Sequence, residues 1–226
     1  MSLILYIIYA ILIIGPIYLI WAITHVNKRV KRIEWARSQE YTLLRIDVPR
    51  NNEKSPLAAE QMFAAIHGIY AENSAFQSHL SFEIVAKEKY IQFYIHVPVH
   101  LKDFIEGQVY AQYPTVEVNE VEDYAKSIDF ASKSYASCDL LLTKPDSYPI
   151  KQFTDFEVDP ISGITSVMSK LNDSEEVWLQ LVVRPVGDEW QEKGHAMVSS
   201  VRSGSKATGK GFFGMFIKTL FAFVKA

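Results

Sequence analysis

Hydrophobic and polar positions follow three different patterns along this chain. The first pattern is an apolar run from Leu3 to Ile23 that contains no charged residue. As a helix, this run would be ~31 Å long, close to the ~30 Å thickness of the hydrocarbon core of a bilayer. A cleaved signal peptide fits less well, because no basic residue precedes the run. We therefore predict a transmembrane helix over residues 1–24, with Leu3, Trp21 and Ile23 as anchor residues.

A basic cluster follows the apolar run and predicts its orientation. Its members are Lys28, Arg29, Lys31, Arg32 and Arg37. Because Lys and Arg beside a membrane helix favour the cytoplasmic side, we predict a single-pass protein of the inner cell membrane with a cytoplasmic C-terminal domain. Residues 25–40 would form a basic juxtamembrane helix. Its basic face either contacts anionic lipid headgroups or serves only as a topology signal.

Residues 41–123 show the second pattern, in which strand-like and helix-like spacing alternate. Apolar residues at every second position predict strands, and apolar residues at helical spacing predict helices. In chain order these segments are strand 41–49, helix 56–70, strands 80–86 and 90–97, helix 100–112 and strand 115–121. The β-α-β-β-α-β order is that of the ferredoxin-like arrangement, in which both helices cover one face of the sheet. We expect this arrangement to form the main domain of an α+β protein.

The third pattern covers the rest of the chain. Residues 124–204 begin with a polar connection and continue with helix and strand signals, including the apolar strand 177–185, so they predict a second small α/β domain. Residues 205–226 predict a linker and an amphipathic helix, which either lies in the membrane interface or packs on protein. The apolar positions of that helix are Phe212, Phe213, Phe216, Leu220 and Phe223.

Charge and cysteine content narrow the classes of function. The chain has a formal net charge of −3 and becomes more acidic once its N-terminal basic cluster is set aside. Proteins that bind nucleic acid through the phosphate backbone are usually basic, so we expect no direct contact with nucleic acid. Cys138 is the single cysteine, which excludes a disulfide within the chain.

Catalytic motifs are absent from the sequence. Residues 204–211 approach the phosphate-binding pattern G-x-x-x-x-G-K-[ST], but Gly211 stands where the magnesium-binding hydroxyl belongs. A flexible linker explains the same residues. We therefore predict a protein that is not an enzyme and that has no catalytic residue, cofactor or metal site, although an enzyme of an unrecognised type stays open.

One face of the predicted sheet is a candidate interaction surface. Its residues on the strand 90–97 are Tyr90, Gln92, Tyr94 and His96. Aromatic residues on an open sheet face can stack on bases, as in RNA-recognition modules. The same residues can instead pack against a second domain or subunit, as exposed apolar patches commonly do.

Three stretches carry a resemblance to a known family. They are LLRIDVPRNNEKSPLAAEQMFAAIHGI, SFEIVAKEKYIQFYIHVPVHLKDFIEGQVYAQYP and VWLQLVVRPVGDEWQEKG. Together with the N-terminal apolar run, they resemble the membrane-anchored N-terminal region of bacterial conjugation or type IV secretion coupling ATPases, over roughly residues 1–204. The ATPase motor of those proteins has no counterpart in this sequence. The chain is therefore either a fragment or a standalone relative.

The resemblance implies a role in assembly. We predict a membrane-anchored cytoplasmic scaffold of a secretion or DNA-transfer machine that is not catalytic by itself. Its expected partners are membrane lipid, a separately encoded or missing ATPase motor, and further copies of the chain. The alternative is a nucleic-acid or ligand-binding module that uses the sheet face around Tyr90 and Tyr94.

Overall fold

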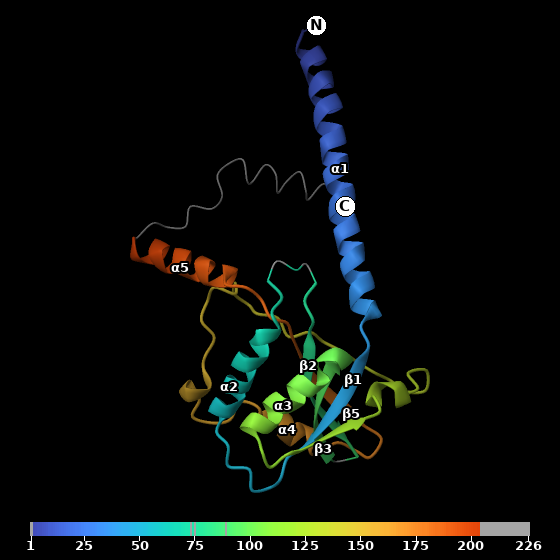
Figure 1. The fold of residues 1–226 in the computed structure, drawn as a ribbon, viewed down its shortest axis with the longest axis vertical. Helices are drawn as coiled ribbons and strands as arrows, with labels where there is room; N and C mark the ends of the chain where they lie inside the picture. Colours follow the sequence, from blue (N-terminus) through green and yellow to red (C-terminus); the bar gives the residue numbers. More distant parts are fainter. Residues whose placement is uncertain (1, 73, 75, 89, 204–226) are drawn as a thin grey trace. The chain divides into compact units, whose positions relative to one another are not determined.

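The computed structural model describes residues 2–72, 74, 76–88 and 90–203. The chain forms two compact units: residues 1–135 with 156–186, and residues 136–155 with the chain from Gly187 onward. The helices are α1 (Ser2–Ser38), α2 (Pro56–Ile66), α3 (Lys102–Gln112), α4 (Ser162–Met168) and α5 (Glu189–Arg202). The strands are β1 (Tyr41–Asp47), β2 (Leu80–Lys87), β3 (Tyr90–Pro98), β4 (Glu117–Val121) and β5 (Glu176–Val183) (Figure 1).

An antiparallel sheet organises the first unit. It has five strands in the order β4-β1-β3-β2-β5. The first six elements after α1 follow the predicted β-α-β-β-α-β order, apart from short 3-10 turns, and the α+β class is confirmed. The register pairs Leu44 with Ile95 across β1 and β3, and Phe82 with Ile95 across β2 and β3. These pairs place apolar residues of three strands on one face, because side chains along a strand alternate between faces.

Helices α2 and α3 cover that face and close the main core (Figure 1). Ile105 and Val109 are four residues apart on α3, so both point towards the sheet, and both are buried. Met62 and Ile66 have the same spacing on α2 and join the same core. The apolar positions from which we predict α2, α3 and the strands are thus the positions that form the core between them.

Strand β5 extends the sheet beyond the predicted ferredoxin-like domain. It pairs with β2 along its whole length, from Leu80 opposite Val183 to Lys87 opposite Glu176. Our sequence interpretation places this strand in a second α/β unit. Local periodicity identifies a strand but carries no information about a partner roughly a hundred residues away, so the fifth strand of the main sheet was not predicted.

Helix α1 requires a correction. In the part of the chain that the structure describes, no helix combines the length and the apolar character needed to cross a membrane. The transmembrane helix predicted over residues 1–24 is therefore wrong, and so is the single-pass inner-membrane location derived from it. The prediction considered the apolar run in isolation. The structure has one 37-residue helix, in which the run continues without a break into the basic segment 25–38.

The second unit contains α5 and the extended segment before α4. Lys193 Nζ on α5 lies 3.9 Å from Asp146 Oδ2 within this unit. The predicted amphipathic helix with Phe212, Phe213, Phe216, Leu220 and Phe223 lies outside the described residues.

Candidate functional site

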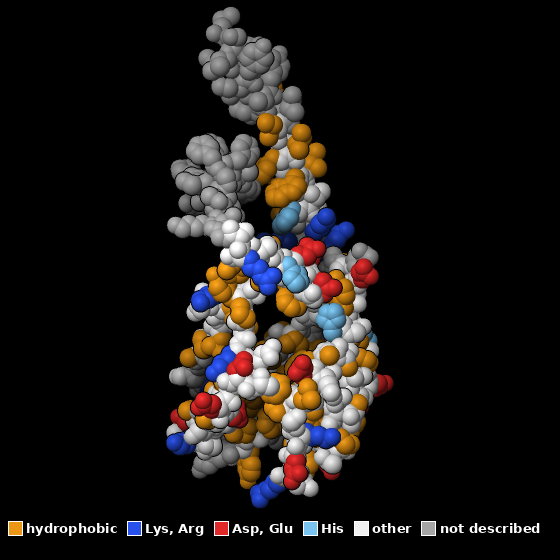
Figure 2. Space-filling view, turned by 90° about the vertical axis from the view of Figure 1, so that its left-hand side faces the viewer, with side chains coloured by type: hydrophobic (Ala, Val, Ile, Leu, Met, Phe, Trp, Pro, Cys, Tyr) orange, Lys and Arg blue, Asp and Glu red, His pale blue; other side chains and the backbone are white. Residues whose placement is uncertain are grey.

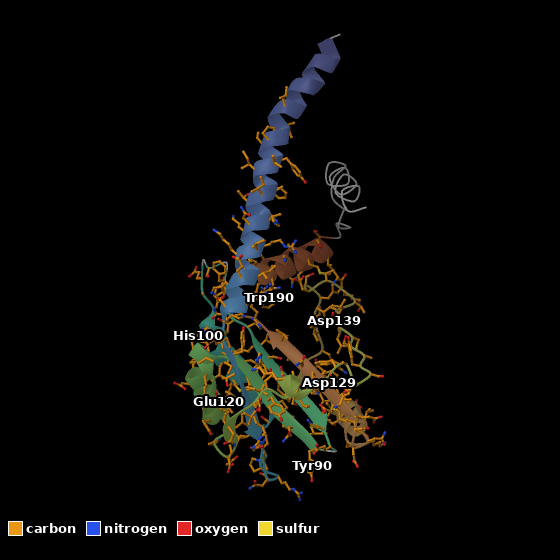
Figure 3. The ribbon with its side chains drawn as sticks, turned by 90° about the vertical axis from the view of Figure 1, so that its right-hand side faces the viewer. Tyr90, His100, Glu120, Asp129, Asp139 and Trp190 are labelled. Atoms are coloured by element: carbon orange, nitrogen blue, oxygen red, sulfur yellow. The ribbon has the colours of Figure 1, made fainter. Side chains whose placement is uncertain are left out.

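The sheet face opposite α2 and α3 carries the predicted interaction residues. Tyr90 lies at the end of the sheet away from α1 (Figure 3) and is 73% exposed. Tyr94 is only 8% exposed. Its hydroxyl donates a 2.7 Å hydrogen bond to Gln92 Oε1. Of the two tyrosines, only Tyr90 is therefore accessible to a partner.

A segment of the same chain covers the middle of this face. Tyr124 opens the short turn after β4, and its ring centroid lies 5.4 Å from that of Tyr94 and 4.7 Å from that of Trp178. Its hydroxyl donates a 2.5 Å hydrogen bond to Glu83 Oε2. The segment then reaches β5, where Lys133 Nζ lies 3.2 Å from Glu176 Oε1. The chain itself thus fills the place where a stacked base would contact Tyr94.

The other end of the face carries a histidine and tyrosine cluster. The ring of His96 stacks on Tyr41 with 4.8 Å between centroids and 15° between planes. The Tyr41 hydroxyl is hydrogen-bonded to His79 at 3.0 Å from Nδ1. This cluster lies where β1, β2 and β3 approach the last turn of α1.

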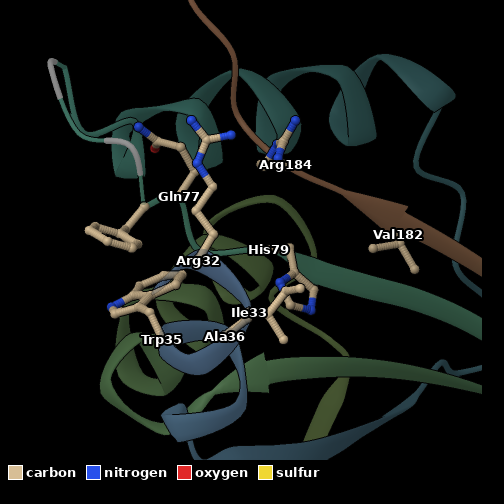
Figure 4. Close-up of a pocket in the computed structure, with 9 residues that line it drawn as sticks. Arg32, Ile33, Trp35, Ala36, Gln77, His79, Val182 and Arg184 are labelled. Atoms are coloured by element: carbon tan, nitrogen blue, oxygen red, sulfur yellow. The ribbon is translucent and has the colours of Figure 1, made fainter. Parts of the chain in front are cut away.

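A pocket of about 550 Å³ opens beside this cluster (Figure 4). Three segments that are distant in sequence line it: the last turns of α1, the loop before β2, and the end of β5. Its lining residues are Arg32, Ile33, Trp35, Ala36, Phe76, Gln77, His79, Val182 and Arg184. We call this cavity the α1 pocket. All of its lining residues belong to the first unit.

Local structure explains how α1 and the loop present their side chains to the α1 pocket. Arg32, Trp35 and Ala36 are three and four residues apart on a helix, so they share one face. Trp35 packs against Phe76 with 5.5 Å between ring centroids. Gln77 closes its loop, because its amide both accepts from the Ala71 N–H at 3.1 Å and donates to the Ala71 carbonyl at 2.5 Å. Helix α1 thus positions Trp35, and the loop that Gln77 closes positions Phe76, so that the two side chains form one wall of the pocket.

Positive charge dominates the polar part of the α1 pocket. Its lining contains two guanidinium groups, of Arg32 and Arg184, and no carboxylate. Neither arginine takes part in any ion pair formed among the described residues. Figure 4 shows both side chains pointing to the same side of the pocket. Two arginines without an acidic partner form an arrangement suited to an anion.

His79 is the titratable group at the base of the α1 pocket. Burial lowers the pKa of His79, and the neighbouring His96 and Arg184 lower it further. The neutral imidazole is therefore favoured. An anion between the guanidinium groups would oppose this effect, because a negative charge stabilises the protonated ring.

The basic residues predicted from the sequence separate into two groups. Arg32 lines the α1 pocket, whereas Lys28, Arg29, Lys31 and Arg37 do not. Figure 2 shows apolar side chains along the described upper part of α1 and Lys and Arg side chains towards its lower end. The predicted anchor residues Trp21 and Ile23 are both about half exposed on α1, and Leu3 lies in its first turn.

Sequence reasoning missed most of the α1 pocket. The spacing of Arg32, Trp35 and Ala36 is the one local signal that could have indicated a functional helix face. Nothing local connects them with His79 or Arg184. Within the described ranges, no group of three or more His, Cys, Asp or Glu residues is placed so that it could bind a metal ion.

Comparison with known proteins yields one family. A family model described as a domain of unknown function, DUF8128, matches residues 23–207. The matched range includes every lining residue of the α1 pocket and leaves out most of the apolar run. No curated protein and no solved structure matches the chain.

Proposed function

The chain belongs to the DUF8128 family, a domain of unknown function, and from its geometry we propose that it is a non-enzymatic binding module that holds a small anionic ligand in the α1 pocket. The observation that carries this proposal is the pair Arg32 and Arg184, two guanidinium groups in one cavity whose described lining residues include no carboxylate.

The energetics of such a pair support binding of moderate strength. Charge-assisted hydrogen bonds from a guanidinium to a phosphate or carboxylate are about twice as strong as neutral ones. Both arginines are exposed, and water weakens their interaction with an anion. We therefore expect dissociation constants of roughly 10 µM to 1 mM, not the nanomolar range of fully enclosed sites. The volume of the pocket lies in the usual range for small-molecule sites, about 300–1,000 Å³.

Isothermal titration calorimetry with inorganic phosphate tests the proposal. The unmodified chain should bind phosphate, and R32Q and R184Q should each weaken binding at least fivefold, since each removes one of two charge-assisted contacts. The matched control is R37Q. Arg37 lies on the last turn of the same helix and does not line the pocket, so its replacement should leave the affinity within twofold. Equal losses in R37Q and R184Q, or no binding by the unmodified chain, would overturn the proposal.

A second candidate function is assembly. Apolar side chains are exposed along α1 over two turns and more, and they include Ile17, Leu19, Ile20 and Val26. Exposed apolar patches of this kind mark interaction surfaces. We propose, as the resemblance implies, that the chain also acts as a scaffold of a secretion or DNA-transfer machine, through contacts of α1 with further copies of itself or with an ATPase motor.

The mass of the full chain in solution tests the assembly role. Light scattering at tens of micromolar protein should give an oligomer, and the double variant I17Q/I20Q should shift the mass towards the monomer. Variant R37Q, on the same helix, should leave the mass unchanged. A monomeric unmodified chain that captures no ATPase would contradict this second function.

A further inference from the structure

We infer that the anion held in the α1 pocket is the phosphate of a nucleotide, whose base stacks on the wall formed by Trp35 and Phe76. This inference rests on the proposed anion-binding function and names the class of ligand. It combines three features of the same cavity: an aromatic wall, two guanidinium groups that form no ion pair with another described residue, and a volume too large for a lone inorganic ion.

The aromatic wall is the first feature. Trp35 comes from α1 and Phe76 from the loop before β2, and their ring planes are tilted by 40°. Both side chains are half-buried and leave part of their surface towards the cavity. Ile33, Ala36 and Val182 make the rest of the wall apolar. An inorganic anion makes no use of such a surface, whereas a heteroaromatic ring gains stacking energy on it.

The second feature is the distribution of charge. Arg32 lies three residues before Trp35 on α1, so the cation and the indole share one helix face. Arg184 approaches from the end of β5. A ligand that touches all three residues must carry its negative charge and its planar ring on the same small molecule. A nucleotide has this form.

The third feature is size. The α1 pocket has a volume of about 550 Å³, within the range of about 300–1,000 Å³ that is usual for sites of small organic ligands. A phosphate ion is only a few water molecules in size and would leave most of the aromatic wall in contact with water. A mononucleotide carries both the anion and a planar ring and would use both parts of the lining.

The lining residues also predict that affinity depends little on the identity of the base and not on Mg²⁺. Gln77 is the one amide in the lining, and both ends of this amide are committed to Ala71. No free side-chain amide is therefore left to read the edge of a base, so adenine and guanine nucleotides should bind within about threefold of each other. No carboxylate in the lining can hold Mg²⁺, so binding should not require this ion.

Calorimetry on the full chain with three probes tests the inference. The probes are AMP, inorganic phosphate and adenosine, which separate the complete ligand from its charged and its aromatic parts. AMP should bind about tenfold more tightly than phosphate, because stacking adds to the charge contacts, and adenosine should bind more weakly than AMP. GMP and added EDTA check the predicted indifference to base and metal.

Two variants test whether the aromatic wall provides the tighter binding of AMP relative to phosphate. W35A should remove the advantage of AMP over phosphate and leave the affinity for phosphate within twofold. Because Trp35 also packs α1 against Phe76, the variant F76L, which keeps an apolar side chain at the loop, serves as a second test and should reduce the advantage of AMP severalfold. The control is W190A, since Trp190 is an exposed tryptophan of α5 outside the pocket lining.

The outcomes distinguish the anion-binding function from the nucleotide inference. If phosphate binds in a way that depends on Arg184 and AMP binds no more tightly, the nucleotide inference is wrong and the anion-binding function stands. If adenosine binds as well as AMP, the phosphate is not the anchor, and the inference is likewise wrong. If neither AMP nor phosphate binds, both levels fail.

Discussion

Tyr124 donates a hydrogen bond to Glu83 across the face of the sheet, and Gln180 Nε2 donates to the same tyrosine oxygen at 3.0 Å. Gln180 Nε2 also donates to Glu83 Oε1 at 3.3 Å. Glu83 is 6% exposed, so its carboxylate depends on Tyr124 and Gln180 as donors in place of water. Burial raises the pKa of Tyr124, and the hydrogen bond to Glu83 raises it further, so the phenol keeps its proton. The two residues fasten the chain after β4 onto the sheet.

Variant Y124F should destabilise the fold by about 1–3 kcal/mol, the cost of leaving the buried Glu83 Oε2 without its donor, while Gln180 still donates to Oε1. The free energy of unfolding in urea measures this change. Y90F is the matched control, because Tyr90 lies on the sheet face that Tyr124 partly covers and is 73% exposed. The effect of Y90F should stay within about 0.5 kcal/mol. Equal effects of the two variants would show that the hydrogen bond to Glu83 does not stabilise the fold.

Variant L44A should cost about 2–5 kcal/mol, because Leu44 is 0% exposed at the centre of the main core and truncation leaves a cavity. Urea midpoints report the loss. L142A provides the comparison, since Leu142 is 63% exposed and its replacement should change stability little. A small effect for L44A would mean that α2 and α3 do not pack on β1 as described.

His79 should make stability fall under acid. Its pKa in the folded chain lies below the ordinary value of about 6.5, through burial first and then His96 and Arg184. The unfolded chain therefore binds the proton more readily than the folded chain. The contribution of His79 to the free energy of unfolding is complete above pH ~6.5 and is lost as the pH falls towards the pKa of the folded state. Tyr41, His96, Arg32 and Arg184 are the titratable or charged neighbours in the cluster and pocket.

Urea unfolding between pH 5 and pH 7 measures this dependence. H79Q should flatten the slope, whereas H195Q, at an exposed position of α5, should leave it unchanged. A slope that is the same in H79Q as in the unmodified chain would contradict the assignment.

Glu88 follows β2 with a φ of +52°, in the left-handed region that costs most residues about 1 kcal/mol or more. Asparagine tolerates this region better. We expect E88N to stabilise the fold by about 0.5–1 kcal/mol and E88A to give no such gain, because alanine keeps the steric cost. Thermal or urea unfolding of both variants distinguishes the backbone effect from the loss of charge, which the two share.

The sequence predicts the parts of this fold that depend on neighbours along the chain. The helices α2 and α3 and the hairpin of β2 and β3 follow from periodicity, because each buries one regular stripe of residues. The pairing of Leu80 with Val183 and the meeting of Arg32 with Arg184 depend on residues roughly a hundred or more positions apart. No local pattern encodes such a contact.

The membrane-span prediction failed for a related reason. The apolar run was interpreted as a membrane span because its length was considered without the rest of its helix. For the face around Tyr94, packing against protein was one of the two alternatives that the sequence left open. The residue that covers Tyr94 is Tyr124, in a polar segment with no strand or helix pattern of its own.

The α1 pocket lies at one end of a long helix, so a small change of angle at the pocket displaces the other end of the helix. A helix of 37 residues is about 55 Å long, and Arg32 and Trp35 lie within its last two turns. A ligand that tilts these turns by a few degrees would displace the opposite tip of the helix by roughly 4 Å, in proportion to that length. The occupancy of a small cavity would thereby change the position of the far end of the longest helix among the described residues.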